Sequence, residues 1–345
     1  MFGRDRKSIQ MEVFAKTDLG RTRDHNEDRF LVADLTRAEA SLQPRVRDHE
    51  VGERGSLLVV ADGMGGAAAG ELASQMAADT IYDQMLKMWS AEPERTGQRF
   101  AFRLKEAVEM ANSHIHAYAK AHPEVRGMGT TTTAVGVFGD HVFLTQVGDS
   151  RAYLIRNGTA YQLTKDQSLM QRLVEAGELT EEEAAQSERR NIILQALGPD
   201  AKVKVDLTHQ QLRQGDVLVL CSDGLSGQVR KEEIAEIAGG ASDLQAACDR
   251  LIALANGRGG PDNITVVLAR FDGDGLPATD AREAVGHQVY PLIDTETSTE
   301  PVPVYRGSRP PEPARRARWR AIVAIVGAGV LVSLAVYLYR VLRSP

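Results

Sequence analysis

The residues best suited to chemistry in this sequence are six acids that stand at the ends of predicted β-strands. Three of them follow an apolar run and three precede one. In an antiparallel sheet the end of one strand lies beside the start of its neighbour, so acids of both kinds are expected to meet at one edge. The acids that follow a run are Asp62, Asp149 and Asp223, and those that precede one are Glu27, Asp28 and Asp262.

The apolar run Leu57-Leu58-Val59-Val60-Ala61 leads directly into Asp62, and three of the four residues after Asp62 are glycine. Glycine at position 63 lets the backbone approach a ligand closely, so we expect the Gly63 carbonyl oxygen to serve as a ligand beside the Asp62 carboxylate. The alternative is an ordinary turn from strand to helix, with Asp62 as the helix cap. Because an acid recurs at several strand ends, we favour the ligand.

Carboxylates gathered in partly desolvated loops repel one another unless cations neutralise them. Oxygen ligands without clustered histidine or cysteine select hard ions such as Mg²⁺ or Mn²⁺. Two such ions about 3.5–4 Å apart share a bridging water, lower its pKa and hold the oxygens of an in-line displacement at phosphorus. Arg23, on the loop that leads to Glu27, offers the planar donors that a phosphate dianion needs. The pattern therefore predicts metal-assisted hydrolysis of a phosphoester.

Apolar periodicity predicts the strands and helices that position these acids. The two-residue turns Gly139-Asp140 and Asn157-Gly158 separate apolar runs, which is typical of hairpins and predicts an antiparallel sheet. Residues 36–55 are polar and mixed in charge, which predicts a solvated loop. The predicted strands are 13–17, 29–33, 57–61, 130–138, 141–147, 151–155, 160–163, 203–207, 216–222 and 264–271. Helices are predicted at 71–89, 100–121, 231–238 and 242–256, with short helices between 165 and 197.

The composition limits the function and the compartment. A formal net charge of -6 and an aromatic content of 5% give no support to a nucleic-acid-binding surface. Cys221 lies in a predicted strand and Cys248 in a predicted helix, which argues against a disulfide framework or a thiolate metal site and fits a reducing compartment. Residues 1–10 are charged and lack an apolar segment, so no secretory signal is expected there.

The C-terminal part of the sequence predicts a membrane anchor. Residues 321–339 are almost entirely apolar and would form about 29 Å of helix, close to the hydrocarbon thickness of a bilayer. Trp319, Tyr337 and Tyr339 stand at its edges, where interfacial aromatic residues belong; a buried core helix is the alternative. Arginines are concentrated before the span, so the preceding domain is expected to face the cytoplasm of a single-pass cell-membrane protein. The predicted division is a catalytic domain at 1–271, a Pro-, Thr- and Arg-rich linker at 272–318, a transmembrane helix at 319–341 and a short extracytoplasmic tail at 342–345.

Six motifs occur in order along residues 11–271. They are Thr17-Asp18-Leu19-Gly20 through Arg23-x-x-Asn26-Glu27-Asp28, Ala61-Asp62-Gly63-Met64-Gly65-Gly66, Gly127-Met128-Gly129-Thr130-Thr131, Gly148-Asp149-Ser150-Arg151, Cys221-Ser222-Asp223-Gly224-Leu225 and Gly260-Pro261-Asp262-Asn263. This series resembles the successive motifs of the metal-dependent serine/threonine protein phosphatases of type 2C, in their bacterial branch. Any one motif alone would be weak, whereas six in register are highly specific.

The resemblance implies a fold of class α+β: two face-to-face antiparallel β-sheets flanked by helices (an α-β-β-α sandwich), with a mobile flap at residues 165–190. It implies two Mn²⁺ or Mg²⁺ ions as cofactors, and a third, weaker one. Asp62 would bridge the two ions, a metal-bridging water would be the nucleophile, and Arg23 would bind the substrate phosphate. The other ligands would be Asp223 and Asp262 for the first ion, Glu27 and the Gly63 carbonyl for the second, Asp28 as a ligand or a supporting partner, and Asp149 with Asp223 and Asn191 for the third.

The residue that protonates the leaving group is not assigned by the resemblance. Animal relatives place a histidine directly after Asp-Gly, whereas this chain has Met64 there, as bacterial members usually do. His25 lies nearby in the sequence, and we favour a metal-bound water over it as the proton donor.

The anchored architecture resembles that of phosphatases which oppose membrane-bound bacterial Ser/Thr kinases. The expected substrates are phosphorylated serine and threonine residues of cytoplasmic proteins, including a cognate membrane kinase. Two alternatives stay open: a non-catalytic module that binds phosphoproteins at the membrane, and a regulatory phosphatase that acts on one anti-sigma antagonist. Metal titration would separate the first alternative from an enzyme, and substrate trapping would separate the second.

Overall fold

The structure is a computed structural model that describes residues 8–41, 46–187, 189, 191–278 and 284–292. The chain divides into two compact units, Met1–Leu292 and Ile293–Pro345, and the described residues all belong to the first. The second unit, with most of the predicted linker and the predicted transmembrane helix and tail, lies outside the described residues.

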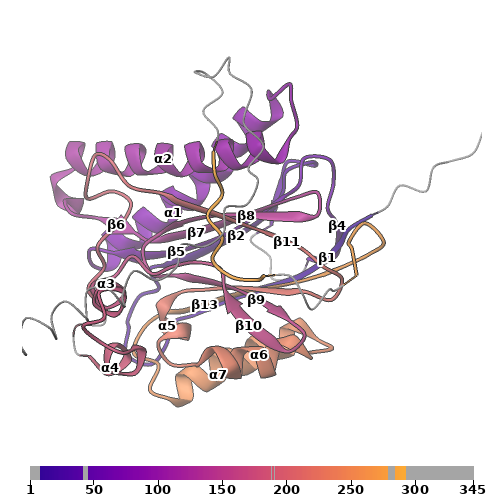
Figure 1. Ribbon diagram of the computed structural model, residues 1–345. Coiled ribbons are helices and arrows are strands. Elements are labelled where there is room, and N and C mark those ends of the chain that lie inside the picture. Colours follow the sequence, from indigo (N-terminus) through magenta and orange to yellow (C-terminus); the bar gives the residue numbers. More distant parts are fainter. Residues whose placement is uncertain (1–7, 42–45, 188, 190, 279–283, 293–345) are drawn as a thin grey trace, which may run out of the picture. The chain divides into compact units, whose positions relative to one another are not determined.

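Two antiparallel sheets lie face to face in the first unit (Figure 1). The first sheet has the strand order β10-β9-β12-β13-β1-β4, and the second has the order β11-β8-β7-β5-β2-β3, with β6 paired to β5. The first sheet contains β1 (Gln10–Asp18), β4 (Val46–Glu50), β9 (Arg151–Arg156), β10 (Thr159–Gln162), β12 (Val217–Cys221) and β13 (Ile264–Asp272). The second contains β2 (Asp28–Asp34), β3 (Glu39–Ser41), β5 (Ser56–Met64), β6 (Gly129–Thr130), β7 (Thr132–Phe138), β8 (His141–Val147) and β11 (Asp206–Gln211).

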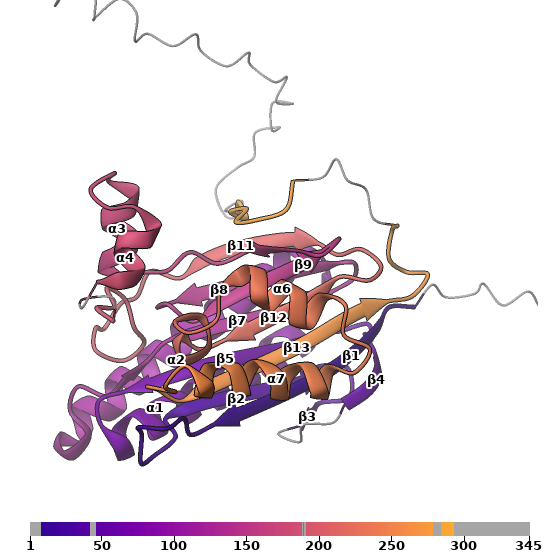
Figure 2. The same cartoon turned by 90° about the horizontal axis from the view of Figure 1, so that it is seen from below.

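Helices cover the outer face of each sheet, as Figures 1 and 2 show, so the predicted α-β-β-α sandwich is confirmed. The second sheet is covered by α1 (Ala67–Gln84), its π-helical continuation η1 (Met85–Trp89) and α2 (Gly97–Ala121). The first sheet is covered by α5 (Asp223–Ser226), α6 (Lys231–Gly239) and α7 (Leu244–Gly257). The remaining helices are the 3-10 turn η2 (Pro123–Val125) and, at one end of the sandwich, the short helices α3 (Leu169–Glu175) and α4 (Glu181–Gln186).

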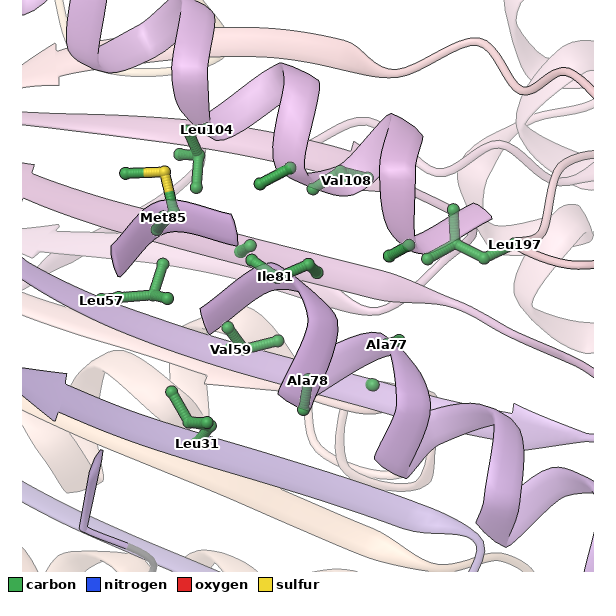
Figure 3. Close-up of a cluster of buried hydrophobic side chains, with 14 of the residues drawn as sticks. Leu31, Leu57, Val59, Ala77, Ala78, Ile81, Met85, Leu104, Val108 and Leu197 are labelled. Atoms are coloured by element: carbon green, nitrogen blue, oxygen red, sulfur yellow. The ribbon is translucent and has the colours of Figure 1, made fainter. Parts of the chain in front are cut away.

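Strand β5 is buried on both faces, as its unbroken apolar run predicts. Leu57 and Val59 pack into the cluster under α1 and α2 (Figure 3), and Leu58 and Val60 pack into the cluster between the two sheets. All four side chains are fully buried, and each such burial contributes about 1.5–3 kcal/mol. The strand that carries Asp62 is therefore held rigidly between these two clusters.

The prediction of a solvated loop at residues 36–55 was wrong, because the structure places β3 and β4 there. Strand β4 pairs with β1 at the edge of the first sheet. His49 of β4 is buried, and its Nε2 lies 2.9 Å from the Ser56 hydroxyl. An edge strand rich in charged residues has no apolar alternation, so its sequence resembles that of a loop.

The compact unit continues past the predicted domain boundary at residue 271. We refer to residues 284–292 as the C-terminal strap. The Gln288 carbonyl accepts a hydrogen bond from the His209 amide (3.0 Å), and the Tyr290 amide donates one to the Leu207 carbonyl (2.9 Å). The Tyr290 ring packs at right angles to that of Phe143, with the centroids 5.3 Å apart. The strap therefore covers the edge of the second sheet at β11.

Among the residues that the structure describes, no helix is both long enough and apolar enough to span a bilayer.

Candidate active site

Asp62 and Asp28 lie opposite each other where β5 pairs with β2. The end of β5 is fixed through the backbone of Asp62: its carbonyl accepts from the amide of Thr131 (2.8 Å) and the hydroxyl of Thr130 (2.8 Å). The strand continues through Gly63 to Met64, so the interpretation of an immediate strand-to-helix turn at Asp62 does not hold. The register of two strands thus brings two of the predicted acids together.

Asp223 begins α5 and is separated from the end of β12 only by Ser222, and its charge helps to raise the pKa of Asp62. The preceding Ser222 donates its hydroxyl proton to Asp28 Oδ2 (2.7 Å). This hydroxyl orients Asp28, and in the sequence Ser222 was marked only by its position beside Asp223.

Asp262 and Arg23 form an ion pair, with Arg23 Nη2 2.7 Å from Asp262 Oδ2. The neighbouring Asn263 fixes the loop that carries Arg23 and Glu27: its Oδ1 accepts from the Glu27 amide (2.8 Å), and its Nδ2 donates to the His25 carbonyl (3.0 Å). Sequence reasoning placed Asn263 in a motif but gave it no role. The structure shows that Asn263 helps to join the two loops, together with the Arg23–Asp262 ion pair.

Glu27 lies against the start of α1. A Cβ atom on Gly70 would collide with Glu27 Oε2, so a side chain at position 70 would displace the Glu27 carboxylate. The Gly63 amide donates to the Glu27 carbonyl (3.1 Å), which joins Glu27 to the end of β5. Burial raises the pKa of the Glu27 carboxyl above its ordinary value, with Arg23 acting in the opposite direction.

Asp149 is 6% exposed and sits in the loop between β8 and β9. After burial, the charge of Asp223 contributes most to raising the pKa of Asp149. The loop is held by buried polar groups: the Ser150 hydroxyl lies 2.8 Å from that of Thr131, and Gln146 Nε2 donates to the Ser150 carbonyl (2.7 Å). Asn191 is exposed, and no contact within the described residues joins it to Asp149.

Burial and mutual repulsion raise the pKa values of the clustered acids. Burial, and then the charge of neighbouring acids, raises the pKa of Asp28 to about 7, that of Asp149 to about 8 and that of Asp223 to about 6. The same causes raise the pKa of Asp62 well above its ordinary value. A divalent cation bound among these carboxyls would favour their ionised forms and lower their pKa values.

The donor set fits a hard cation. Asp149 Oδ1 and Asp223 Oδ1 are buried and have no hydrogen-bond partner within the described residues. Both Asp262 oxygens are engaged, one by Arg23 and the other by the Asn263 amide (2.9 Å). Across the described residues, no three or more His, Cys, Asp and Glu side chains have the mutual spacing of a metal site. We therefore expect the carboxylates to turn towards an ion when one binds, and Asp262 to share its oxygens between that ion and its present donors or to release Arg23.

Two facing sheets carry carboxylates and an arginine at one edge. This arrangement is typical of a class of metal-dependent phosphohydrolases, in which oxygen ligands hold the ions. A family model described as "Protein phosphatase 2C" matches residues 38–263. The chain belongs to this family, and it is a metal-dependent protein-serine/threonine phosphatase.

Individual relatives agree with this assignment. Over 262 residues the chain is 37% identical to the serine/threonine phosphatase stp of Listeria monocytogenes, a match that covers 76% of this chain and 96% of the relative. The structure is similar to that of the Mycobacterium tuberculosis serine/threonine phosphatase PstP/Ppp, with a TM-score of 0.64, 36% identity, and coverage of 76% of this chain and 99% of the other. A structure of the catalytic domain of PstP in complex with two manganese ions matches with a TM-score of 0.60 and 35% identity, covering 76% of this chain and 99% of that one.

Proposed function

We propose that this chain is a membrane-anchored phosphatase that removes phosphate from phosphoserine and phosphothreonine in cytoplasmic proteins, with two Mn²⁺ or Mg²⁺ ions. The observation that carries the proposal is the convergence of buried carboxylates from β2, β5 and the start of α5, which raise one another's pKa values. Arg23 lies beside this cluster on an exposed loop.

The acids would share two ions. Asp62 would bridge them, because it stands at the centre of the cluster, opposite Asp28 and beside Asp223. The other ligands would be Asp223 and Asp262 for one ion, and Glu27 with the Gly63 carbonyl for the other. Asp28 would be a further ligand or a supporting partner of these ligands. Asp149 and Asn191 would be available to a third, more weakly bound ion. When bound, the ions supply an activated water for attack at phosphorus and offset the negative charge of the phosphate.

Arg23 would bind and orient the phosphate. Its guanidinium is half exposed and is held at the edge of the cluster by Asp262. A planar guanidinium offers paired donors to phosphate oxygens, so release of Asp262 to an ion and capture of a phosphate by Arg23 are complementary events. His25 is exposed on the same loop.

The cellular setting of the proposal comes from the sequence. Residues 321–339 have the length and polarity of a membrane span, and the arginines before them favour a cytoplasmic position for the phosphatase domain. A phosphatase held at the inner face of the membrane would meet membrane-bound Ser/Thr kinases and their substrates. We therefore propose that it opposes such a kinase.

The test is phosphate release from a phosphothreonine peptide by the full-length protein, with and without Mn²⁺. The wild-type protein should release phosphate only with metal, and Asp62→Asn should lower kcat by at least about a hundred-fold, because the shared ligand is lost. Asp79→Asn, which changes an exposed acid on α1, is the matched control and should behave as the wild type.

Equal activity of Asp62→Asn and the wild type would contradict the proposal. Binding of the phosphopeptide without any Mn²⁺-dependent phosphate release would instead support a non-catalytic binding module.

A further inference from the structure

Gln167 has every one of its polar groups engaged, although it lies outside the acidic cluster. Its amide donates to the Gly148 carbonyl (2.9 Å), and its own carbonyl accepts from the Leu194 amide (2.7 Å). Its side-chain Oε1 accepts from the Gly148 amide (3.0 Å), and its Nε2 donates to Asp206 Oδ2 (2.9 Å). Gln167 therefore hydrogen-bonds both the amide and the carbonyl of Gly148, the residue before Asp149.

The Gly148 backbone cannot be fixed by its own side chain. Gly148 has a φ of 99°, and a Cβ atom there would collide with the Thr131 side chain. The residue is buried, so an unpaired amide would carry a desolvation cost. The Gln167 side chain supplies the acceptor for that amide.

The Nε2 group of Gln167 also links this loop to the second sheet, through its hydrogen bond to Asp206. Asp206 is the first residue of β11 and pairs with Gln146 of β8. Gln146 Nε2 in turn donates to the carbonyls of Gly148 (3.0 Å) and Ser150 (2.7 Å). Hydrogen bonds and the β11–β8 strand pairing thus connect Gly148, Gln167, Asp206 and Gln146 on the loop that carries Asp149.

We propose that Gln167 is a positioning residue that fixes the direction of the Asp149 carboxylate, and thereby the binding of a divalent cation at Asp149. The inference rests on the proposed function, since it assigns Asp149 to an ion. Asp149 Oδ1 is buried with no hydrogen-bond partner within the described residues, so its direction depends on the loop and not on a contact of its own. Gln167 does not touch the reacting atoms.

The experiment is calorimetric titration of the full-length protein with Mn²⁺ alone. Asp149→Asn should remove the weakest binding step of the wild type. Gln167→Ala should raise the dissociation constant of that same step about ten-fold, which corresponds to the loss of one or two buried hydrogen bonds, and should leave the tighter steps unchanged. Gln171→Ala is the matched control: Gln171 lies on α3 and bonds only Glu175 through its side-chain amide, so Mn²⁺ binding should not change.

Two further variants separate positioning from a general loss of structure. Gln167→Glu keeps the acceptor for Gly148 but places a carboxylate against Asp206, so it should weaken the same step; adding Asp206→Asn restores a donor and an acceptor and should rescue it. In the Asp149→Asn background, Gln167→Ala should have no further effect on Mn²⁺ binding.

An unchanged isotherm for Gln167→Ala would overturn the inference. So would an equal weakening of every binding step, or the same loss in the Asp149→Asn background. Phosphate release reports separately: a wild type that binds Mn²⁺ at Asp149 without releasing phosphate defeats the proposed function alone, whereas normal release with an insensitive isotherm defeats this inference alone.

Discussion

At the level of single residues, the candidate active site is a cluster of buried acids whose ionisation is opposed by desolvation and by the charges of their neighbours. Burial is the largest cause of the raised pKa values of Asp28, Asp62, Asp149 and Asp223, and the charges of the neighbouring acids add to it. The fold therefore brings these carboxyls together at a cost in stability whenever they ionise without a counter-ion.

The first prediction concerns the pH dependence of stability in the metal-free protein. The folded-state pKa values of Asp28, Asp149 and Asp223, about 7, 8 and 6, lie above the value of about 3.9 for an unfolded chain. The folded protein therefore binds more protons than the unfolded chain, and the free energy of unfolding falls as the pH rises. This contribution to stability is fully present below about pH 4 and is lost as the pH rises through about 6 to 8.

The melting temperature of EDTA-treated protein should accordingly be lower at pH 8 than at pH 5, and added Mn²⁺ should raise it most at pH 8. Asp149→Asn removes one of these groups and should flatten the dependence. A metal-free protein that melts at a higher temperature at pH 8 than at pH 5, with no change in Asp149→Asn, would contradict this explanation.

A second prediction separates the two partners of Arg23. Arg23→Ala should lower kcat/KM for a phosphopeptide about ten- to a hundred-fold, chiefly through KM, because a charge-assisted hydrogen bond to phosphate is worth about 1.5–3 kcal/mol. The Mn²⁺ concentration needed for half-maximal activity should not rise, since Asp262 no longer has to leave an ion pair. Steady-state kinetics at several Mn²⁺ concentrations measure both quantities.

Arg21→Ala, two residues earlier on the same exposed loop, is the control and should leave both quantities unchanged. If the loss in Arg23→Ala were repaired by excess Mn²⁺, Arg23 would be acting on the ions and not on the substrate.

For the secondary-structure elements, the sequence was sufficient to predict a strand and its acid wherever a clear apolar pattern lies next to an acidic residue. The glycine turns of the hairpins predicted an antiparallel sheet, and the acids at strand ends predicted the edge at which they meet, whereas the pair of facing sheets was implied by the family resemblance. The acids themselves were found because their side chains follow or precede such runs. Their contacts could not be found in this way, because Asn263, Ser222 and Gln167 act through partners far away in the sequence.

The elements that were missed lack periodicity. Strand β4 carries charges at the edge of a sheet, and β11 begins at Asp206 rather than in the predicted run at 203–207. The C-terminal strap has no amphipathic pattern at all, since only Val285, Tyr290 and Leu292 pack against the cores. The pairing of the C-terminal strap with the β11 edge could therefore not be predicted from local sequence patterns.

The strap gives a third prediction. Tyr290→Ala should lower the free energy of unfolding by about 2 kcal/mol, because the ring packs against Phe143 and His209 and is only partly exposed. Chemical denaturation of the full-length protein measures the change. Val289→Ala, at a side chain that is 68% exposed, is the neighbouring control and should shift the free energy by less than about 0.5 kcal/mol. Equal effects of the two substitutions would show that the strap contributes nothing through Tyr290.

At the scale of the whole molecule, the compact unit that ends at Leu292 contains every acid of the candidate site, and the predicted span at 319–341 belongs to the other unit. Catalysis and anchoring should therefore be separable. A chain that ends at residue 292 should retain the turnover of the full-length protein towards a soluble phosphopeptide, while losing its attachment to the membrane.

Membrane attachment is measured by fractionating cells that express either the full-length protein or the chain that ends at residue 292. The full-length protein should sediment with membranes and resist about 1 M salt, because a spanning helix is held by apolar burial, whereas basic segments held only by charge are released by screening. Replacing Arg315, Arg316, Arg318 and Arg320 with Gln in the full-length protein should disturb the orientation of the span without changing its turnover of a soluble phosphopeptide. Protease protection in sealed vesicles reports the orientation. Release of the full-length protein by salt alone would mean that the arginines bind a surface and that residues 319–341 do not cross the bilayer.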